Sequence, residues 1–303
     1  IDPVTAEVVL VPEGVDPVWA YAPGATTDAE RPQVAARALG RIAEPFRSQA
    51  VELLERRGLG RYLPESPGAS WSNVVATDQE RALWLARTEA DERMVVGTMP
   101  GASDALELGT RQQMLDQFKD AYAALDETPL SFEEFAALRF YTISGEADLV
   151  NSNLRGDWKR VRSLFEDAGI KATRRQQQAA LAEARLVASA LAKLPAHDGV
   201  VSRKMKAAKD SPFETLLKAR YRATGARVSD LGFVSTAIGE NPYGGNWVLF
   251  YRTMSGRQVQ RYAYFGAQED EVLHAPGATF DIERVEHDEQ RNEYRVYLVE
   301  RAS

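Results

Sequence analysis

The fold is decided where the chain reads LAEARLVASALAKLPAHDGVVSR, at residues 181–203. As far as Leu194, apolar residues recur three and four positions apart, which is typical of one face of a helix. Pro195 ends this pattern, because a proline cannot continue a helix. The segment 199–203 that follows is short and rich in valine, which indicates a strand. The chain therefore changes from helical to extended structure at Pro195.

The two sides of Pro195 differ in their periodicity along their whole length. Before it, helical patterns cover residues 28–57, 78–92, 103–125, 146–154, 157–167 and 173–194, and a further helix begins at Ser131. Ser103 is the expected cap of the helix at 103–125, and Ser131 with Glu134 forms a capping-box sequence. After it, we expect a helix at 212–223 and strands at 199–203, 232–236, 247–251, 258–265, 271–273, 279–285 and 294–300. Helices first and short strands later predict an α+β fold with mainly antiparallel sheets.

The composition excludes several classes of site. The 303 residues contain no cysteine, so disulfides, thiolate nucleophiles and cysteine-bound metals are ruled out. No two of His197, His274 and His287 are four residues apart, and we predict no metal site. The net charge of −7 argues against a large nonspecific nucleic-acid surface.

The chain carries no signal that predicts a membrane partner. No apolar run approaches the roughly 18 residues that a spanning helix needs. The start, Ile1-Asp2-Pro3-Val4, lacks the basic and apolar regions of a signal peptide. It also lacks an initiator Met, so we expect the chain to be part of a longer protein.

Three separated signals in the C-terminal half carry chemical groups. They are Arg203 at the end of a strand, Ser235-Thr236 within a strand, and Glu269-Asp270-Glu271 beside a turn. Taken singly, each has an ordinary explanation, as a surface arginine, as β-propensity or as a solvated acidic face. Their order along the chain is more informative than any one of them.

In that order, the three signals resemble the Arg/Ser-Thr-Ser/Glu-x-Glu class of mono-ADP-ribosyltransferases, which includes bacterial exotoxins. Tyr141-Thr142 followed by Asn151 to Arg155 is similar to the helical segment of the same class, so the resemblance covers about residues 110–303. It implies a fold of two facing, mainly antiparallel β-sheets with an N-terminal helical subdomain. It also implies that NAD+ is a co-substrate and that no metal is needed.

The resemblance assigns the catalytic roles. Glu271 would be the central catalytic glutamate, Ser235 would orient it, and Arg203 would bind the NAD+ phosphates. A carboxylate near the nicotinamide ribose can stabilise the oxocarbenium-like transition state, as it does in glycosidases. Glu269 would serve the acceptor, and in this class a glutamate there accompanies modification of arginine.

Further residues would bind NAD+ or the acceptor. Tyr141, Asn151, Arg155 and Thr236 would join the three catalytic residues at NAD+, and residues 239–246 would cover the nicotinamide. In the loop before Glu269, Tyr264 and Phe265 would recognise the acceptor. The alternative explanation is that these two aromatic side chains belong to the hydrophobic core.

Two departures from the pattern of the class are visible. Ala237 stands where the class has a second serine, and Ser202-Arg203-Lys204 replaces the usual Tyr-Arg-Gly. Arg220 and Arg222 are therefore alternatives to Arg203.

We expect two domains, an irregular and helical region at residues 1–100 and the transferase domain at residues 101–303. Residues 11–24, VPEGVDPVWAYAPG, resemble a segment near the end of phage minor head proteins, which suggests a fusion to such a protein.

These expectations imply a macromolecular acceptor, first of all a protein, in the cytoplasm of a bacterial host or target cell. Delivery would be with a phage particle or through a secretion system. An immunity protein or a phage particle is a further candidate partner. An NAD glycohydrolase and an inactive phage structural protein remain as alternatives.

Overall fold

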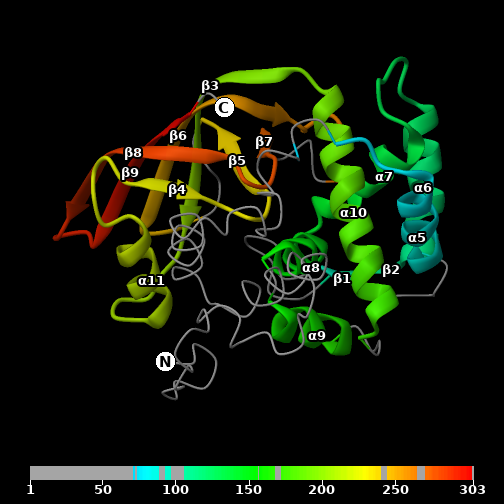
Figure 1. Cartoon of the computed structure of the whole chain (residues 1–303), viewed down its shortest axis with the longest axis horizontal. Helices are drawn as coiled ribbons and strands as arrows, with labels where there is room; N and C mark the ends of the chain where they lie inside the picture. Colours follow the sequence, from blue (N-terminus) through cyan, green and yellow to red (C-terminus); the bar gives the residue numbers. More distant parts are fainter. Residues whose placement is uncertain are drawn as a thin grey trace, which may run out of the picture. The chain divides into compact units, whose positions relative to one another are not determined.

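The computed structural model describes residues 71, 74–88, 93–96, 106–155, 157–167, 172–239, 244–264 and 270–301. The helices are α5 (Asp78–Thr88), α6 (Arg111–Ala123), α7 (Phe132–Tyr141), α8 (Ser144–Leu154), α9 (Trp158–Asp167), α10 (Arg174–Lys193) and α11 (Pro212–Arg220). The strands are β1 (Arg93–Val96), β2 (Leu106–Thr110), β3 (Ala196–Met205), β4 (Arg227–Ser229), β5 (Val234–Ile238), β6 (Trp247–Gln258), β7 (Glu271–His274), β8 (Thr279–Asp288) and β9 (Glu293–Glu300). Figure 1 shows the strands β3 to β9 gathered on one side of the described part of the chain and the helices α5 to α10 on the other.

Most of the predicted elements are confirmed, and the α+β class with them. The long helix that ends before Pro195 is α10, and the strand after it is β3. The predicted capping box is present at the start of α7, where Ser131 Oγ accepts from the amide of Glu134 and the Glu134 carboxylate accepts from the amide of Ser131. Such a box satisfies two amides that the first turn of a helix leaves without a partner.

The helical layer is built around α10, which packs against α5, α7 and α8. Its core is apolar and aromatic, with Trp84, Met114, Phe118 and Phe140 fully buried. Four buried charged side chains from α5, α6, α8 and α10 also meet there. The core extends to Phe233 and Leu273, so the helices and the strands share it.

The strands β3 to β9 are hydrogen-bonded in the order β3-β5-β7-β6-β9-β8-β4, and β3 also pairs with β6. Every pairing is antiparallel except that of β6 with β9. Because β6 pairs with β3 and β7 as well as with β9, it links the group β3-β5-β7 to the group β9-β8-β4. Leu249 and Val296, from β6 and β9, are fully buried in the second apolar core, which lies against these strands.

The strand predicted at 258–265 is wrong. β6 ends at Gln258, and the chain then turns, with the amides of Tyr262 and Ala263 donating to the carbonyl of Val259 at 2.8 and 2.9 Å. Val259, Tyr262 and Ala263 are all buried. Their spacing of three and four residues puts them on one face of a tight turn, whereas a strand would require alternation.

The helix predicted to begin at Ser103 is wrong at its start. Residues 106–110 form β2, which pairs with β1, and α6 begins only at Arg111. Thr110 is the actual cap, because its hydroxyl accepts from the amide of Gln113 and the Gln113 side chain accepts from the amide of Thr110. The helix predicted at 78–92 is confirmed over its described residues, as α5, and β1 begins at Arg93.

The N-terminal calls lie mostly outside the described residues, among them the helix at 28–57 and the phage-like segment at 11–24. Residues 68–303 form one compact unit, which includes α5, and the domain boundary expected at residue 100 stays a prediction. Among the residues that the structure describes, no helix combines the length and apolar character needed to cross a membrane.

Candidate active site

The structure joins Ser235 and Glu271 across neighbouring strands. In the β5–β7 register Ala237 lies opposite Glu271, so Ser235 is its diagonal neighbour on the same face. Ser235 Oγ donates to Glu271 Oε1 at 2.6 Å, and only 6% of Glu271 is exposed. A hydroxyl bound to one carboxylate oxygen restricts the rotation of the carboxylate.

Backbone hydrogen bonds hold Glu271 in place from both sides. Its carbonyl accepts from the amide of Val259, and the carbonyl of Asp270 accepts from the amide of Ile238, both at 2.9 Å. Ala237, which lacks the hydroxyl usual in the class, lies directly opposite Glu271. Within Ser235-Thr236-Ala237, Ser235 is therefore the residue whose hydroxyl binds this carboxylate.

Asn151 ties the start of β5 to the helices. Its Oδ1 accepts from the amide of Phe233 at 2.8 Å, and its Nδ2 donates to Tyr141 Oη at 3.0 Å. Burial raises the pKa of Tyr141 well above its usual value; Glu271 also raises this pKa, whereas the hydrogen bond from Asn151, Arg155 and Arg203 lower it. Glu271 and two guanidiniums are thus close enough to Tyr141 to act on its hydroxyl.

Arg203 lies on β3, opposite Leu249, and is half-buried. Among the described residues it has no carboxylate partner, although it acts electrostatically on Tyr141 and Tyr251. Of the two alternatives to it, Arg220 also acts on Tyr251, and Arg222 is exposed. Arg203 thus acts electrostatically on the hydroxyl of Tyr141, as Glu271 does, and Arg203 and Arg220 both act on that of Tyr251.

Arg155 is held by a residue that the sequence did not single out. Its Nε and Nη2 lie 3.0 and 2.9 Å from Asp230 Oδ1. Asp230 follows β4 in the loop that leads to Ser235. The only sequence signal for it is an aspartate two residues before a glycine, and that pattern is common in turns.

Thr236 is placed apart from the other predicted NAD+-binding residues. Successive side chains on a strand point to opposite faces, so Thr236 faces away from Ser235 and Glu271. It is fully buried, and its hydroxyl donates to the carbonyl of Val272 at 2.7 Å. The structure therefore does not bring Thr236 together with the site.

The predicted acceptor residues are only partly described. Tyr264 packs against Phe118 and against the guanidinium of Arg139, 5.6 Å from its ring centre, and its amide donates to Thr142 Oγ1 at 2.8 Å. It anchors the chain before the predicted acceptor loop. Phe265, Glu269 and residues 240–243 lie outside the described residues.

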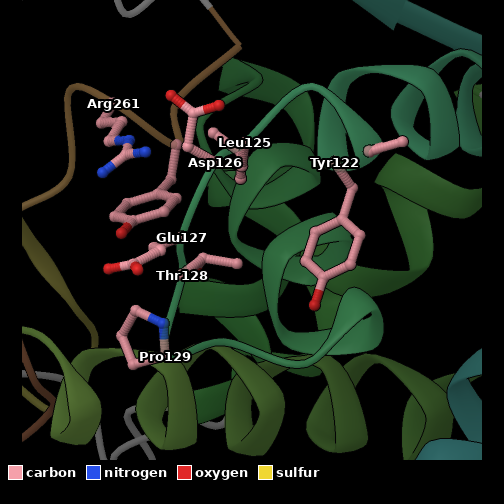
Figure 2. A pocket seen from close by; sticks show the side chains of 9 residues that line it. Tyr122, Leu125, Asp126, Glu127, Thr128, Pro129 and Arg261 are labelled. Atoms are coloured by element: carbon pink, nitrogen blue, oxygen red, sulfur yellow. The ribbon is translucent and has the colours of Figure 1, made fainter.

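A cleft of about 810 Å³ lies beside the turn that follows β6. It is lined by Tyr122, Ala123, Leu125, Asp126, Glu127, Thr128, Pro129, Arg261 and Tyr262. Figure 2 shows Arg261, Asp126 and Glu127 toward one side of it and Tyr122 toward the other. None of the predicted NAD+-binding residues lines this cleft, so it is separate from the Ser235–Glu271 site.

No protein-family model matches the chain, and no curated protein matches it. Solved structures do match. The type III effector XopAI from Xanthomonas axonopodis pv. citri is 16% identical, with a TM-score of 0.54 over 84% of this chain and 99% of that chain. ADP-ribosyltransferase HopU1 of Pseudomonas syringae pv. Tomato DC3000 is 18% identical, with a TM-score of 0.53 over 76% of this chain and all of the other. The chain therefore has the ADP-ribosyltransferase fold that its sequence predicted.

Proposed function

We propose that this protein cleaves NAD+ and transfers the ADP-ribose to a guanidinium group, namely that of an arginine in an acceptor protein. The observation that carries the proposal is the buried Glu271 carboxylate, bound by Ser235 at 2.6 Å. Glu271, Arg155 and Arg203 all act electrostatically on the hydroxyl of Tyr141. A carboxylate and two guanidiniums suit a substrate with a ribose that becomes cationic and a diphosphate that is anionic. The ADP-ribosyltransferase fold supports this assignment.

In the proposed reaction, the bond between ribose C1′ and nicotinamide breaks, and its electron pair leaves with nicotinamide. Glu271 stabilises the positive charge that develops on the ribose and binds its 2′-hydroxyl. Arg203 and Arg155 bind the diphosphate, and Asn151 and Tyr141 support that side of the site. Ser235 holds Glu271 in the orientation this requires.

The acceptor step uses the second glutamate. An arginine side chain is protonated at neutral pH and is a poor nucleophile. A guanidinium nitrogen bonds to C1′ while its proton passes to the Glu269 carboxylate. An acidic chain also suits a cationic acceptor.

The proposal is tested with NAD+ labelled in its adenylate half, incubated with the protein and either agmatine or a bacterial lysate. We expect nicotinamide release, labelled agmatine, and lysate label that hydroxylamine removes and agmatine reduces. Free ADP-ribose with no labelled acceptor would instead indicate an NAD glycohydrolase. No nicotinamide release would indicate a catalytically inactive interaction protein, and label removed by nuclease would identify a nucleic-acid acceptor.

An effector role is part of the same proposal. It rests on the likeness to XopAI, which is described as a type III effector. We place the action of this chain in the cytoplasm of a bacterial host or target cell, so the acceptor should be found in the bacterial lysate.

Glu269→Gln should separate the two half-reactions. A glutamine cannot take the proton from the guanidinium, so transfer to agmatine should fall by about 100-fold, while NAD+ hydrolysis should change by less than about threefold. Both rates can be followed in one assay, as labelled agmatine and free ADP-ribose. Glu283→Gln, at an exposed position of β8, is the matched control for the loss of one charge. Equal losses of transfer and hydrolysis in Glu269→Gln would contradict this division of roles.

A further inference from the structure

Asp230 lies between two arginines at the C-terminal ends of different helices. Its Oδ1 contacts Arg155, the residue that follows α8, and its Oδ2 lies 3.7 Å from Nη2 of Arg220, the last residue of α11. Arg220 also donates to the carbonyl of Ser229 at 2.6 Å. One carboxylate group therefore joins the guanidiniums at the ends of two separate helices, and carries one negative charge against their two positive charges.

The loop that carries Asp230 is itself tightly held. Asp230 Oδ1 accepts from the amide of Gly232 at 2.9 Å, and the carbonyl of Asp230 accepts from the amide of Gly277 at 2.6 Å. A Cβ on Gly232 would lie 2.6 Å from Asn151 Oδ1 and 3.0 Å from Arg155 Nη2. A side chain at this position would therefore displace the ends of the Asn151 and Arg155 side chains from their present partners.

Asp230 is charged at neutral pH. Burial raises its pKa, but Arg155, Arg220 and the amide of Gly232 outweigh burial and hold the pKa below its usual value. The same electrostatic neighbourhood includes Arg203, since Arg203, Arg220 and Asp230 all act on the hydroxyl of Tyr251. Two guanidiniums therefore contact one fixed carboxylate, four residues before the start of β5 and five before Ser235, and Arg203 acts on the same tyrosine hydroxyl as Arg220 does.

We propose that Asp230 is the positioning residue of a diphosphate site, in which it holds Arg155 and Arg220 beside Arg203 for the diphosphate of NAD+. This inference rests on the proposed function and adds Arg220 to the groups that bind the substrate. An arginine side chain loses considerable rotational freedom when it binds a ligand. Fixing two of them before the substrate arrives removes that cost from binding, which is the effect of preorganisation.

Asp230→Asn tests the proposal, because asparagine keeps the shape but turns an amide NH₂ or a weaker acceptor toward the arginines. We expect the affinity for ADP-ribose, measured by calorimetry, to fall by about tenfold, equivalent to one charge-assisted hydrogen bond. The KM for NAD+ should rise by a similar factor, while kcat changes by less than about threefold. A residue with a merely structural role would lower the melting temperature without this split between KM and kcat.

The matched control is Asp281→Asn on β8, since Asp281 also lies between two arginines, Arg227 and Arg301, at 3.3 and 3.2 Å. It should leave ADP-ribose binding unchanged. In an Arg155→Gln background, Asp230→Asn should cost less than it does alone, because one of its partners is gone. Arg220→Gln, which leaves the Asp230–Arg155 pair intact, should also weaken ADP-ribose binding and serves if Asp230→Asn does not fold.

Equal ADP-ribose affinity in the wild type and Asp230→Asn, or in the wild type and Arg220→Gln, would overturn the proposal. The binding measurement is independent of turnover. A wild-type protein that binds ADP-ribose but does not cleave NAD+ would therefore refute the proposed function and still decide the role of Asp230.

Discussion

Glu271→Gln is expected to lower the rate of NAD+ cleavage by about 100-fold or more, since one preorganised charge at a transition state contributes several kcal/mol. Glutamine keeps the size of the side chain and its acceptor oxygen, and Ser235 can still donate to it. The negative charge that opposes the developing cation on the ribose is lost. The measurement is nicotinamide release under saturating NAD+, so that the change is read in kcat.

Two further variants grade this effect. Ser235→Ala removes the hydroxyl 2.6 Å from Glu271 Oε1 but leaves the charge, so its loss should be smaller, about 10-fold. Asp270→Asn removes the same charge from the exposed neighbouring residue and should leave the rate unchanged. If Glu271→Gln retained the rate of Asp270→Asn, the assignment of the catalytic carboxylate would be wrong. Ser235→Ala should add little to Glu271→Gln, because the hydroxyl acts through that carboxylate.

The sequence predicted the contact between Ser235 and Glu271 more reliably than their surroundings. Both residues lie in short strands that are mainly buried, where a slip of one residue would turn the apolar set to the wrong face. The order of the motifs along the chain therefore predicted that Ser235 and Glu271 are neighbours in space. Thr236 was grouped with Ser235 because the two are adjacent in sequence, and the same alternation sends its side chain to the opposite face.

Other parts of the site carried no periodic signal. Asp230 lies in a turn, and its two arginine partners lie 75 and 10 residues before it, at the ends of α8 and α11, so no helical or strand period connects the three. The turn at Val259 to Tyr264 was read as a strand because its apolar residues fit two periods equally over so short a length. The choice between them is made by contacts with α6 and α7, such as that of Tyr264 with Phe118.

The helical layer contains four charges that are almost completely buried. Arg87 and Arg111 each contact both Glu146 and Glu183, at distances of 2.8 to 3.1 Å. The guanidinium of Arg111 also lies 4.1 Å from the ring centre of Phe140. These side chains come from α5, α6, α8 and α10. Because the two positive and two negative charges offset each other, removal of one should be far more costly than the net contribution of the group.

Arg111→Met should lower the free energy of unfolding by about 3–5 kcal/mol, because it leaves two buried carboxylates with one guanidinium. Urea unfolding at constant pH measures this change. Arg160→Met is the control, since its ion pair with Asp148 is about half exposed, and it should cost about 0–1 kcal/mol. The double variant Arg111→Met/Glu183→Met restores the balance of charge with apolar side chains and should recover most of the loss. Equal effects of Arg111→Met and Arg160→Met would contradict the argument.

The same variant has an expected dependence on pH. Burial raises the pKa of Glu183 to about 7, while Arg111 opposes this rise. Removal of Arg111 therefore raises the pKa of Glu183 further. A carboxyl whose pKa is higher in the folded than in the unfolded state binds more protons when the protein is folded. The free energy of unfolding therefore falls as the pH rises toward the folded pKa. The deficit of Arg111→Met relative to the wild type should thus be smaller at pH 5 than at pH 8, whereas the small deficit of Arg160→Met should not grow over this range. A deficit of Arg111→Met that shrinks as the pH rises would show that Glu183 is not the group that Arg111 neutralises.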